Sequence, residues 1–412
     1  MHFINKIRKK GFIGCVNYIK YCFIKSINTL VFTLCLLFKI DEYSIVLESE
    51  GDCCDNAYAL YNYMKKNGYL EKYKITWLVE QPGNFQKEKK VNYVQKNIYN
   101  CVSFKTIYRL RTCHWYIYDH CNIMSNYKKR DDQIFIYLSH GWGYKAAKGG
   151  SLENCKSKFD YMTATGPVSA EGLSKYWNSD IKNTIVTGYP RLDYFFGEDS
   201  SVLNHIDNIW KFDTYTKVFF WMPTFRQSTN QALTENYIKS ETGLPILETL
   251  DMLKKLDSLL SNINVLLVFK IHHLQLELPV FNNKFNNIIF INDEELRNNN
   301  IQLYQLIKCA DALISDYSSI SIDYLLLDRP IIYTLDDYEQ YDKSRGLFPH
   351  NAIDYMPGYH VYTVEELNNS IIEIRKGIDR YSDDRKLVMN NYHTYRDGNS
   401  SRRILDMFDI KK

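Results

Sequence analysis

Residues 312–333 read ALISDYSSISIDYLLLDRPIIY, and this stretch decides the fold. Ala312–Ser315 is predicted as a short apolar strand that ends in a hydroxyl-rich turn, a helix begins near Ser319, and Pro330 opens the next strand. This succession predicts a βαβ unit with parallel strands. The helix start offers backbone N–H groups and the hydroxyls of Ser318 and Ser319 to an anion such as a diphosphate. Plain N-capping is the alternative, because serine is common at helix starts.

The same alternation of short apolar strands and helices continues along the rest of the chain. Further strands are predicted at 45–48, 75–79, 115–118, 134–139, 217–222, 265–272, 288–292 and 330–334. Strands that alternate with helices favour parallel sheets covered on both faces. The chain has 412 residues, and a single core stops growing beyond roughly 250 residues. The sequence therefore predicts an α/β protein with two Rossmann-like domains, at 41–205 and 206–412, that face a cleft.

The first 40 residues are predicted to form a separate basic and apolar segment. Lys and Arg, but no acidic residue, occur before Asp41, and the apolar run 29–38 is about half the roughly 20 residues of a membrane-spanning helix. We expect an amphipathic helix that lies on an anionic inner leaflet, peripheral on the cytoplasmic face of the cell membrane. A buried N-terminal helix with a basic outer face is the alternative. The net charge of +3 argues against nucleic-acid binding.

The cysteines predict neither a disulfide framework nor a metal site. Ten cysteines lie at irregular spacings without a secretion signal, which indicates reduced thiols in the cytosol. Cys113-His114 and His120-Cys121 have metal-binding side chains, but the residues between them favour a strand. Six residues of strand would separate the two histidines by about 20 Å, too far for one ion. We expect no obligatory metal and leave a Mg²⁺ requirement open.

A histidine in a glycine-rich loop is the first candidate for catalysis. The loop reads SHGWGYK at 139–145 and directly follows a predicted strand. His140 is suited to deprotonate a hydroxyl, because histidine titrates near neutral pH. The glycines let the backbone approach a ligand, and Lys145 can neutralise phosphate. A histidine held structurally in a glycine turn is an equally good interpretation of this motif alone.

Further candidates follow other predicted strands. Lys270 and His272 share a face at the end of the strand predicted at 265–272, and a cation beside a histidine suits a phosphate site. Arginines in loops after strands can bind phosphate through paired hydrogen bonds, although an exposed surface charge is the ordinary explanation. The residues predicted to form the site for a phosphate-containing ligand are Lys145, Arg226, Ser315, Asp316, Ser318, Ser319, Arg345 and Gly346.

Taken together, these motifs resemble the CDP-glycerol glycerophosphotransferase family, the primases and polymerases of teichoic acids and related capsule polymers. The resemblance covers most of the chain after residue 40. It rests on Asp55-Asn56, Ala59-Leu60-Tyr61, His140-Gly141, Lys145, Gly188-Tyr189-Pro190-Arg191, Asp193, Pro223-Thr224-Phe225-Arg226, His272, Ser315-Asp316-Tyr317-Ser318-Ser319, Asp323-Tyr324, Arg329-Pro330, Arg345-Gly346, Pro357-Gly358, Asp397-Gly398, Ser401 and Arg403. The loop departs from the usual His-Gly-Thr-Pro by Trp142 and Gly143, which puts the acceptor or the polyol in question.

The resemblance implies a GT-B-like, membrane-associated enzyme whose C-terminal domain binds CDP-glycerol. It places His140 and His272 on the family's two functionally important histidines, one as the base and the other stabilising charge on phosphate. The implied reaction transfers glycerol phosphate, or a similar polyol phosphate, to a lipid-linked or polymer acceptor, releasing CMP without an obligatory cofactor. The alternatives are a GT-B glycosyltransferase that uses a nucleotide sugar for capsule synthesis, and an inactive membrane-bound scaffold that binds polymer. The sequence predicts neither the oligomeric state nor the choice between glycerol and ribitol.

Overall fold

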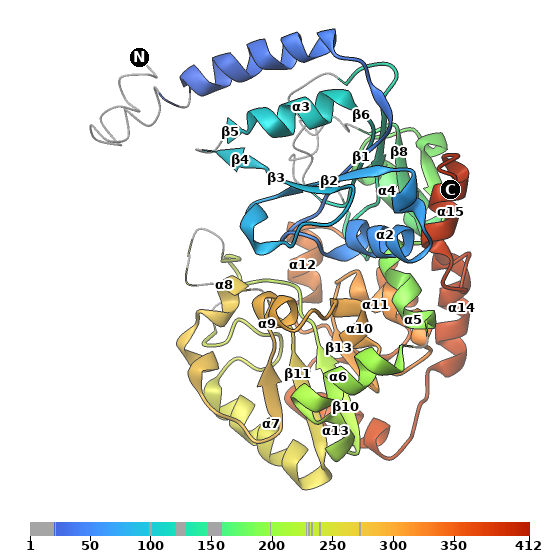
Figure 1. Ribbon diagram of the computed structural model, residues 1–412. Helices are drawn as coiled ribbons and strands as arrows, with labels where there is room; N and C mark the ends of the chain where they lie inside the picture. The colour runs from blue at the N-terminus through green and yellow to red at the C-terminus, as the bar shows by residue number, and fades with distance from the viewer. Residues whose placement is uncertain are drawn as a thin grey trace, which may run out of the picture. The chain divides into compact units, whose positions relative to one another are not determined.

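Two parallel β-sheets organise the fold (Figure 1). A computed structural model describes residues 20, 22–98, 101–120, 129–146, 159–197, 199–227, 229, 231, 234–238, 240–271 and 273–412. The chain packs as two units, one made of residues 1–140, 157–162 and 404–412 and the other of residues 141–156 and 163–403. The predicted α/β class with parallel sheets is confirmed.

The first sheet has seven strands in the order β3-β2-β1-β6-β7-β8-β9. Their bounds are β1 Asp41–Glu48, β2 Lys74–Val79, β3 Val91–Gln95, β6 Cys113–Tyr118, β7 Ile134–Tyr137, β8 Tyr161–Ala164 and β9 Thr184–Val186. The strand order reverses at β1, which pairs in parallel with both β2 and β6. Ligands of open parallel sheets bind beyond the carboxyl ends of the strands at such a reversal. A separate antiparallel pair is formed by β4 (Asn97–Ile98) and β5 (Cys101–Val102).

Helices α2 (Asp55–Lys66) and α3 (Phe104–Thr112) belong to the first unit. Helix α2 buries Ala57, Leu60 and Met64, a spacing of three and four residues that places them on one helical face. Helix α3 begins after Ser103, whose hydroxyl accepts a hydrogen bond from the backbone N–H of Thr106 at 3.1 Å. Ile45, Val46 and Leu47 of strand β1 are fully buried, so the core of this unit lies around the centre of the sheet.

The second sheet has six strands in the order β12-β11-β10-β13-β14-β15, and every pair is parallel. Their bounds are β10 Lys217–Trp221, β11 Val265–Phe269, β12 Ile288–Phe290, β13 Ala312–Ser315, β14 Ile331–Thr334 and β15 Tyr359–Val361. Strand β13 has the predicted bounds. The prediction that β11 continues to His272 is wrong, because its partner β12 is short and their pairing ends at Phe269 opposite Phe290. The order reverses at β10, between β11 and β13.

The remaining helices follow the strands of the two sheets. They are α4 Pro167–Tyr176, α5 Asp193–Phe196, α6 Ser200–Trp210, α7 Leu250–Ile263, α8 His273–Leu276, α9 Asp293–Asn298, α10 Leu303–Ile307, α11 Ile320–Tyr324, α12 Tyr338–Ser344, α13 Val364–Arg375, α14 Ser382–Tyr392 and α15 Ser400–Met407. Helix α7 buries Leu253, Leu256 and Leu260 in the core of the second sheet, and α13 buries Leu367 and Ile371 there. These helices cover one face of the sheet with apolar side chains.

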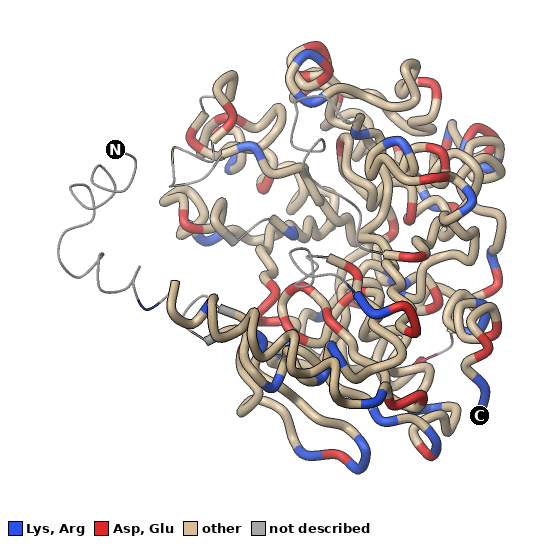
Figure 2. Tube along the Cα trace, turned by 90° about the horizontal axis from the view of Figure 1, so that it is seen from above, with Lys and Arg blue, Asp and Glu red and all other residues tan. Residues whose placement is uncertain are grey.

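Residues 22–34 form a helix in which Lys25 is the single charged residue (Figure 2). It contacts the first unit through Asn28, whose amide donates to the Val102 carbonyl at 2.9 Å, and through Phe32, whose ring lies 4.1 Å from the guanidinium carbon of Arg111. Most of its other apolar side chains are exposed. None of the described helices combines the length and the apolarity that a membrane crossing needs.

Candidate active site

Three neighbouring strand ends of the first unit converge on His140. The turn after β1 carries Glu50, β6 ends just before Asp119 and His120, and β7 is followed by Ser139 and His140. Because parallel strands end at the same edge of a sheet, these side chains lie together at the reversal in strand order. The carboxylate of Asp55, at the start of α2, approaches from the helix.

The backbone around His140 is held in an uncommon conformation. Ser139 has φ +62° and Gly141 has φ +102°, so both neighbours of His140 are left-handed. The Asn56 amide donates to the Ser139 carbonyl at 2.8 Å. Asp55 also has a positive φ, +55°. Left-handed conformations of non-glycine residues cost free energy and persist where the surrounding structure fixes them, often at functional sites.

His140 is the predicted base, and its imidazole is accessible. Its side chain is 60% exposed, and Nδ1 lies 3.3 Å from Oδ2 of Asp55. If Nδ1 carries the proton that it shares with Asp55, the lone pair of the neutral ring is on Nε2. The geometry therefore gives His140 the two features of a general base, an orienting carboxylate and access to a substrate hydroxyl.

His120 was not predicted as a functional residue, yet its ring lies 4.0 Å from that of His140 between centroids. Nδ1 of His120 is 2.7 Å from Asp119 and Nε2 is 2.9 Å from Glu50. Burial alone would lower the His120 pKa, but the hydrogen bonds to Asp119 and Glu50 outweigh it and raise the pKa to about 10. The hydrogen bond from His120 in turn lowers the pKa of Glu50 to about 2.

These side chains include the atoms that a metal ion would use. Ligand atoms of Asp55, His120 and His140 lie within 4.8 Å of one another. Because both ring nitrogens of His120 already bind carboxylates, we interpret the group as a hydrogen-bonded network that holds a cationic imidazole.

In the second unit, the loop after His140 packs against the turn after β13. A Cβ on Gly143 would lie 2.8 Å from the Ser319 backbone nitrogen, and a Cβ on Gly141 would lie 3.1 Å from the Ser319 hydroxyl. Both glycines are therefore needed for this close approach. Trp142 is buried beside Gly172 and its ring lies 5.4 Å from that of Tyr176, so this departure from the family motif anchors the loop.

The fold brings Lys145 next to the segment that contains Arg345 and Gly346. The sequence did not predict this proximity, because about 200 residues separate the two segments. Lys145 and Leu347 form an antiparallel bridge, and the Ala146 N–H donates to the Gly346 carbonyl at 3.0 Å. Desolvation by the surrounding protein lowers the Lys145 pKa. The carboxylate of Asp316 acts to raise this pKa, whereas the positive charges of Arg345 and Arg226 lower it further. Among the described residues Lys145 makes no ion pair, whereas Arg345 pairs with Glu235.

Asp316 organises the turn that follows β13. Its carboxylate accepts from the Thr224 N–H at 2.8 Å and hydroxyl at 2.7 Å, and from the Ser318 N–H at 3.2 Å. The Ser315 hydroxyl donates to the Met222 carbonyl at 3.0 Å. These bonds join the ends of β10 and β13, where the strand order reverses. Ser318 and Ser319 lie half-buried beyond them, and Ser319 makes no side-chain capping bond to α11.

Arg226 is buried between two carboxylates. Its Nη1 lies 2.6 Å from Asp316 and its Nη2 lies 3.0 Å from Asp337, while Nη1 also donates to the Thr224 carbonyl at 2.8 Å. Burial would lower the Arg226 pKa, but Asp316 and Asp337 outweigh it and raise the pKa. Arg226 therefore holds the Asp316 turn in place, and direct contact with phosphate stays a prediction.

His272 lies outside the described residues. The adjoining Lys270 follows the end of β11 and lies 2.9 Å from Asp293, at the start of α9. The catalytic role of His272 therefore stays a prediction.

Two motifs far apart in the sequence fold into one clasp. Asp193 accepts hydrogen bonds from the backbone N–H groups of Ser400 at 2.8 Å and Ser401 at 2.9 Å, at the start of α15. Arg403 donates to the Thr187 carbonyl at 2.9 Å. These hydrogen bonds thus bring together residues 187–193 and 400–403, which adjoin or include the Gly-Tyr-Pro-Arg and Asp-Gly motifs.

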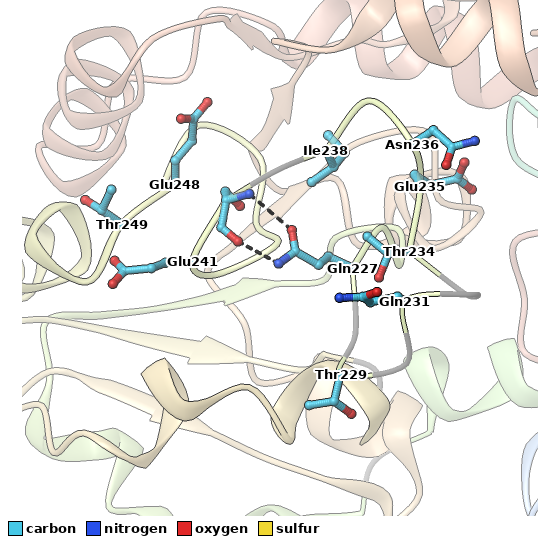
Figure 3. Close-up of a pocket in the computed structure, with 11 residues that line it drawn as sticks. Gln227, Thr229, Gln231, Thr234, Glu235, Asn236, Ile238, Glu241, Glu248 and Thr249 are labelled. Carbon is cyan, nitrogen blue, oxygen red and sulfur yellow. Dashed lines mark hydrogen bonds between the residues drawn. The ribbon is translucent and has the colours of Figure 1, made fainter.

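A cavity of about 720 Å³ lies in the second unit beside Gln227, whose amide group pairs with the backbone of Ser240 (Figure 3). Its lining includes the carboxylates of Glu235, Glu241 and Glu248, and among the described residues it includes no Lys or Arg. This lining suits neutral polar groups better than a diphosphate.

Known proteins are similar to this chain in both sequence and fold. Residues 30–408 match the family described as CDP-Glycerol:Poly(glycerophosphate) glycerophosphotransferase. The teichoic acid ribitol-phosphate primase of Bacillus spizizenii is 25% identical over 390 residues, covering 89% of this chain and 90% of the primase. The teichoic acid glycerol-phosphate primase of Bacillus subtilis is 28% identical over 253 residues, covering 61% of this chain and 58% of that primase.

The fold is similar to that of the wall teichoic acid polymerase TagF. A structure of a TagF variant soaked with CDPG matches with a TM-score of 0.75 and 21% identity, covering 99% of this chain and 98% of that chain. The resemblance drawn from the sequence motifs is confirmed by the match over residues 30–408. The chain therefore belongs to the CDP-glycerol:poly(glycerophosphate) glycerophosphotransferase family.

Proposed function

We propose that this enzyme transfers a polyol phosphate, glycerol phosphate or ribitol phosphate, from a CDP-linked donor to an acceptor hydroxyl and releases CMP. One observation carries the proposal. The loop that starts immediately after His140 packs through Gly143 against the Ser319 backbone, and Lys145 pairs with Leu347 next to Gly346. A candidate base and candidate phosphate-binding groups thus belong to one short stretch of chain. The family membership supports the same reaction class.

In the proposed mechanism, His140 accepts the proton of the acceptor hydroxyl at Nε2. The hydroxyl oxygen then attacks the β-phosphorus of the donor in line, and the bond to CMP breaks. Such transfers depend mainly on positioning and on neutralising charge. Lys145 and Arg345 would neutralise the diphosphate, while the Ser318–Ser319 turn would donate hydrogen bonds to it.

The finer assignments extend this proposal. Residues 41–205 would bind the acceptor, and residues 206–412 would bind the CDP donor. Asp316 and Ser315 would fix the donor-binding turn, and Gly346 would let the chain approach the donor. His272 would stabilise charge on the transferred phosphate. A lipid-linked acceptor, a primase or polymerase mode and a Mg²⁺ requirement are to be settled by assay.

The helix at 22–34 and the turn Cys35–Leu37 that follows it support peripheral attachment to the cytoplasmic face of the membrane. Leu37 is 83% exposed, Phe23 66% and Leu30 59%, and isolated soluble surfaces seldom gather such residues. Exposed apolar side chains next to Lys20 and Lys25 suit an anionic leaflet. Phe23→Ser with Leu37→Ser should reduce co-sedimentation with phosphatidylglycerol vesicles, and high salt should weaken wild-type binding. Unchanged sedimentation of the double variant would contradict this attachment.

The reaction is tested by CMP release from purified enzyme with membrane acceptor. CDP-glycerol, CDP-ribitol and a panel of nucleotide sugars are compared, with and without EDTA. We expect release from a CDP-polyol and its loss in His140→Ala. Release only from a nucleotide sugar would favour the glycosyltransferase, and no release from any donor, with tight polymer binding, would favour the scaffold.

A further inference from the structure

The base proposed for the transfer reaction is surrounded by charged groups from several elements. Asp55 approaches His140 from the start of α2, His120 and Asp119 from the end of β6, and Glu50 from the turn after β1. These are the titratable groups that the described part of the first unit places around the His140 ring. The predicted site residues included none of them, although Asp55 belonged to the motif that carried the family resemblance.

Asp55 is placed to choose the tautomer of His140. Its Oδ2 lies 3.3 Å from Nδ1, and a carboxylate favours the tautomer that carries a proton on the facing nitrogen. The carboxylate itself is anchored by a left-handed backbone at Asp55 and by the hydrogen bond from Asn56 to the Ser139 carbonyl. The same arrangement of base and orienting carboxylate occurs in hydrolytic triads, where it also stabilises the imidazolium that forms.

His120 supplies a positive charge beside the His140 ring, 4.0 Å away between ring centroids. Asp119 is fully buried, binds Nδ1 of His120 with one oxygen and accepts the Ala57 N–H with the other at 2.8 Å. Glu50 holds Nε2 from the solvent side, since its side chain is 71% exposed. Two carboxylates keep His120 cationic, and a cation beside a second imidazole opposes protonation of that ring.

We infer that Asp55 and His120 are positioning residues for His140, with Asp55 fixing the tautomer that presents Nε2 to the acceptor and the His120 cation keeping the ring neutral before proton transfer. The inference rests on the proposed role of His140 as the base. During transfer, the O–H bond of the acceptor breaks and an N–H bond forms at Nε2, while the new O–P bond forms and CMP leaves. Asp55 then stabilises the imidazolium.

The two residues act on His140 with opposite sign, and this provides the test. Asp55→Asn removes a negative charge and the tautomer preference, while asparagine tolerates the left-handed backbone at this position. We expect kcat to fall by about 100-fold or more, with KM for the donor little changed and the acidic limb of the pH–rate profile moved to lower pH. His120→Gln removes a positive charge, so the acidic limb should move to higher pH.

Matched variants separate positioning from loss of structure. His114→Gln makes the same substitution near the start of β6, where His114 contacts the Trp115 ring, and should leave the profile unchanged. If His120→Gln does not fold, Glu50→Gln is measured instead. Glu50 is exposed, and its removal takes a negative charge from the site, so the acidic limb should move to lower pH as it does for Asp55→Asn; a shift to higher pH would contradict the inference. Circular dichroism and melting curves establish that each variant is folded.

The outcomes distinguish this inference from the proposed function. Opposite shifts for Asp55→Asn and His120→Gln, with His140→Ala inactive, support both. If His140→Ala is inactive but folded Asp55→Asn and His120→Gln keep the wild-type kcat and pH profile, the positioning roles are wrong. The same holds if both variants shift the pH profile in the same direction. In either case the assignment of His140 as the base stands. If folded His140→Ala keeps wild-type turnover, the base assignment itself is wrong.

Discussion

Replacing Arg226 tests whether the second unit depends on a buried cation. Arg226→Met leaves the carboxylates of Asp316 and Asp337 without the guanidinium that lies 2.6 Å from one and 3.0 Å from the other. Arg226 and Asp316 are at most 1% exposed and Asp337 is 4% exposed, so water cannot replace the lost bonds. Removing one partner of a buried ion pair costs about 3–5 kcal/mol. For a unit of this size that corresponds to a melting temperature lower by roughly 10 °C.

The assay is differential scanning calorimetry of wild type and Arg226→Met, with Arg380→Met as the control. Arg380 also binds a carboxylate through two nitrogens, both at 2.8 Å from Glu373, but its side chain is 59% exposed. Its loss should leave the melting temperature nearly unchanged, because exposed ion pairs contribute little to stability. Adding Asp337→Asn to Arg226→Met should recover part of the lost stability, because one uncompensated charge is removed.

A melting temperature of Arg226→Met within about 2 °C of wild type would refute the structural role, because the smallest expected change is roughly 6 °C. If that variant instead raised KM for the CDP donor without loss of stability, Arg226 would act mainly as a phosphate ligand.

Three further predictions concern the glycine loop, the clasp and the histidine network. Gly143→Ala places a Cβ 2.8 Å from the Ser319 backbone, so we expect KM for the donor to rise about 10-fold in initial-rate assays; an unchanged KM would contradict this packing. Asp193→Ala should cost about 1–2 kcal/mol in urea unfolding, because it removes two bonds at the start of α15, and an unchanged midpoint would contradict it. NMR should show His120 protonated until about pH 10. Because the folded protein raises this pKa, the protonated His120 stabilises the fold fully below about pH 6.5, and this stabilisation is lost as the pH rises toward 10. An NMR midpoint near pH 6.5 would contradict the hydrogen-bonded network.

The elements that depend on local pattern were predicted well. Strand β13 has the predicted bounds, because an apolar run followed by Ser315-Asp316 marks both its course and its end. Strand β11 was predicted too long, because its end depends on the length of its neighbour β12, which residues 265–272 do not encode. His140 was predicted from its resemblance to the family motifs, which contain functional residues, and this prediction did not depend on the local secondary structure.

The partners of the site residues could not be predicted from local sequence. His120 was considered only with His114 along one predicted strand, whereas its ring contact is with His140 after the neighbouring strand. Arg226 finds its carboxylates 90 and 111 residues away, so its burial was not visible in the sequence. Paired charges and capping bonds between distant segments are set by tertiary packing, which periodicity does not reveal.

The most direct test of polyol-phosphate transfer measures which atoms of the donor reach the acceptor. CDP-glycerol and CDP-ribitol are labelled with ³²P at the β-phosphorus and with ¹⁴C in the polyol, and each is incubated with purified enzyme and membrane acceptor. Polyol-phosphate transfer predicts that both labels enter the acceptor in equal amounts from at least one donor, with unlabelled CMP released. Transfer of ¹⁴C without ³²P, or of neither label from both donors, would contradict polyol-phosphate transfer.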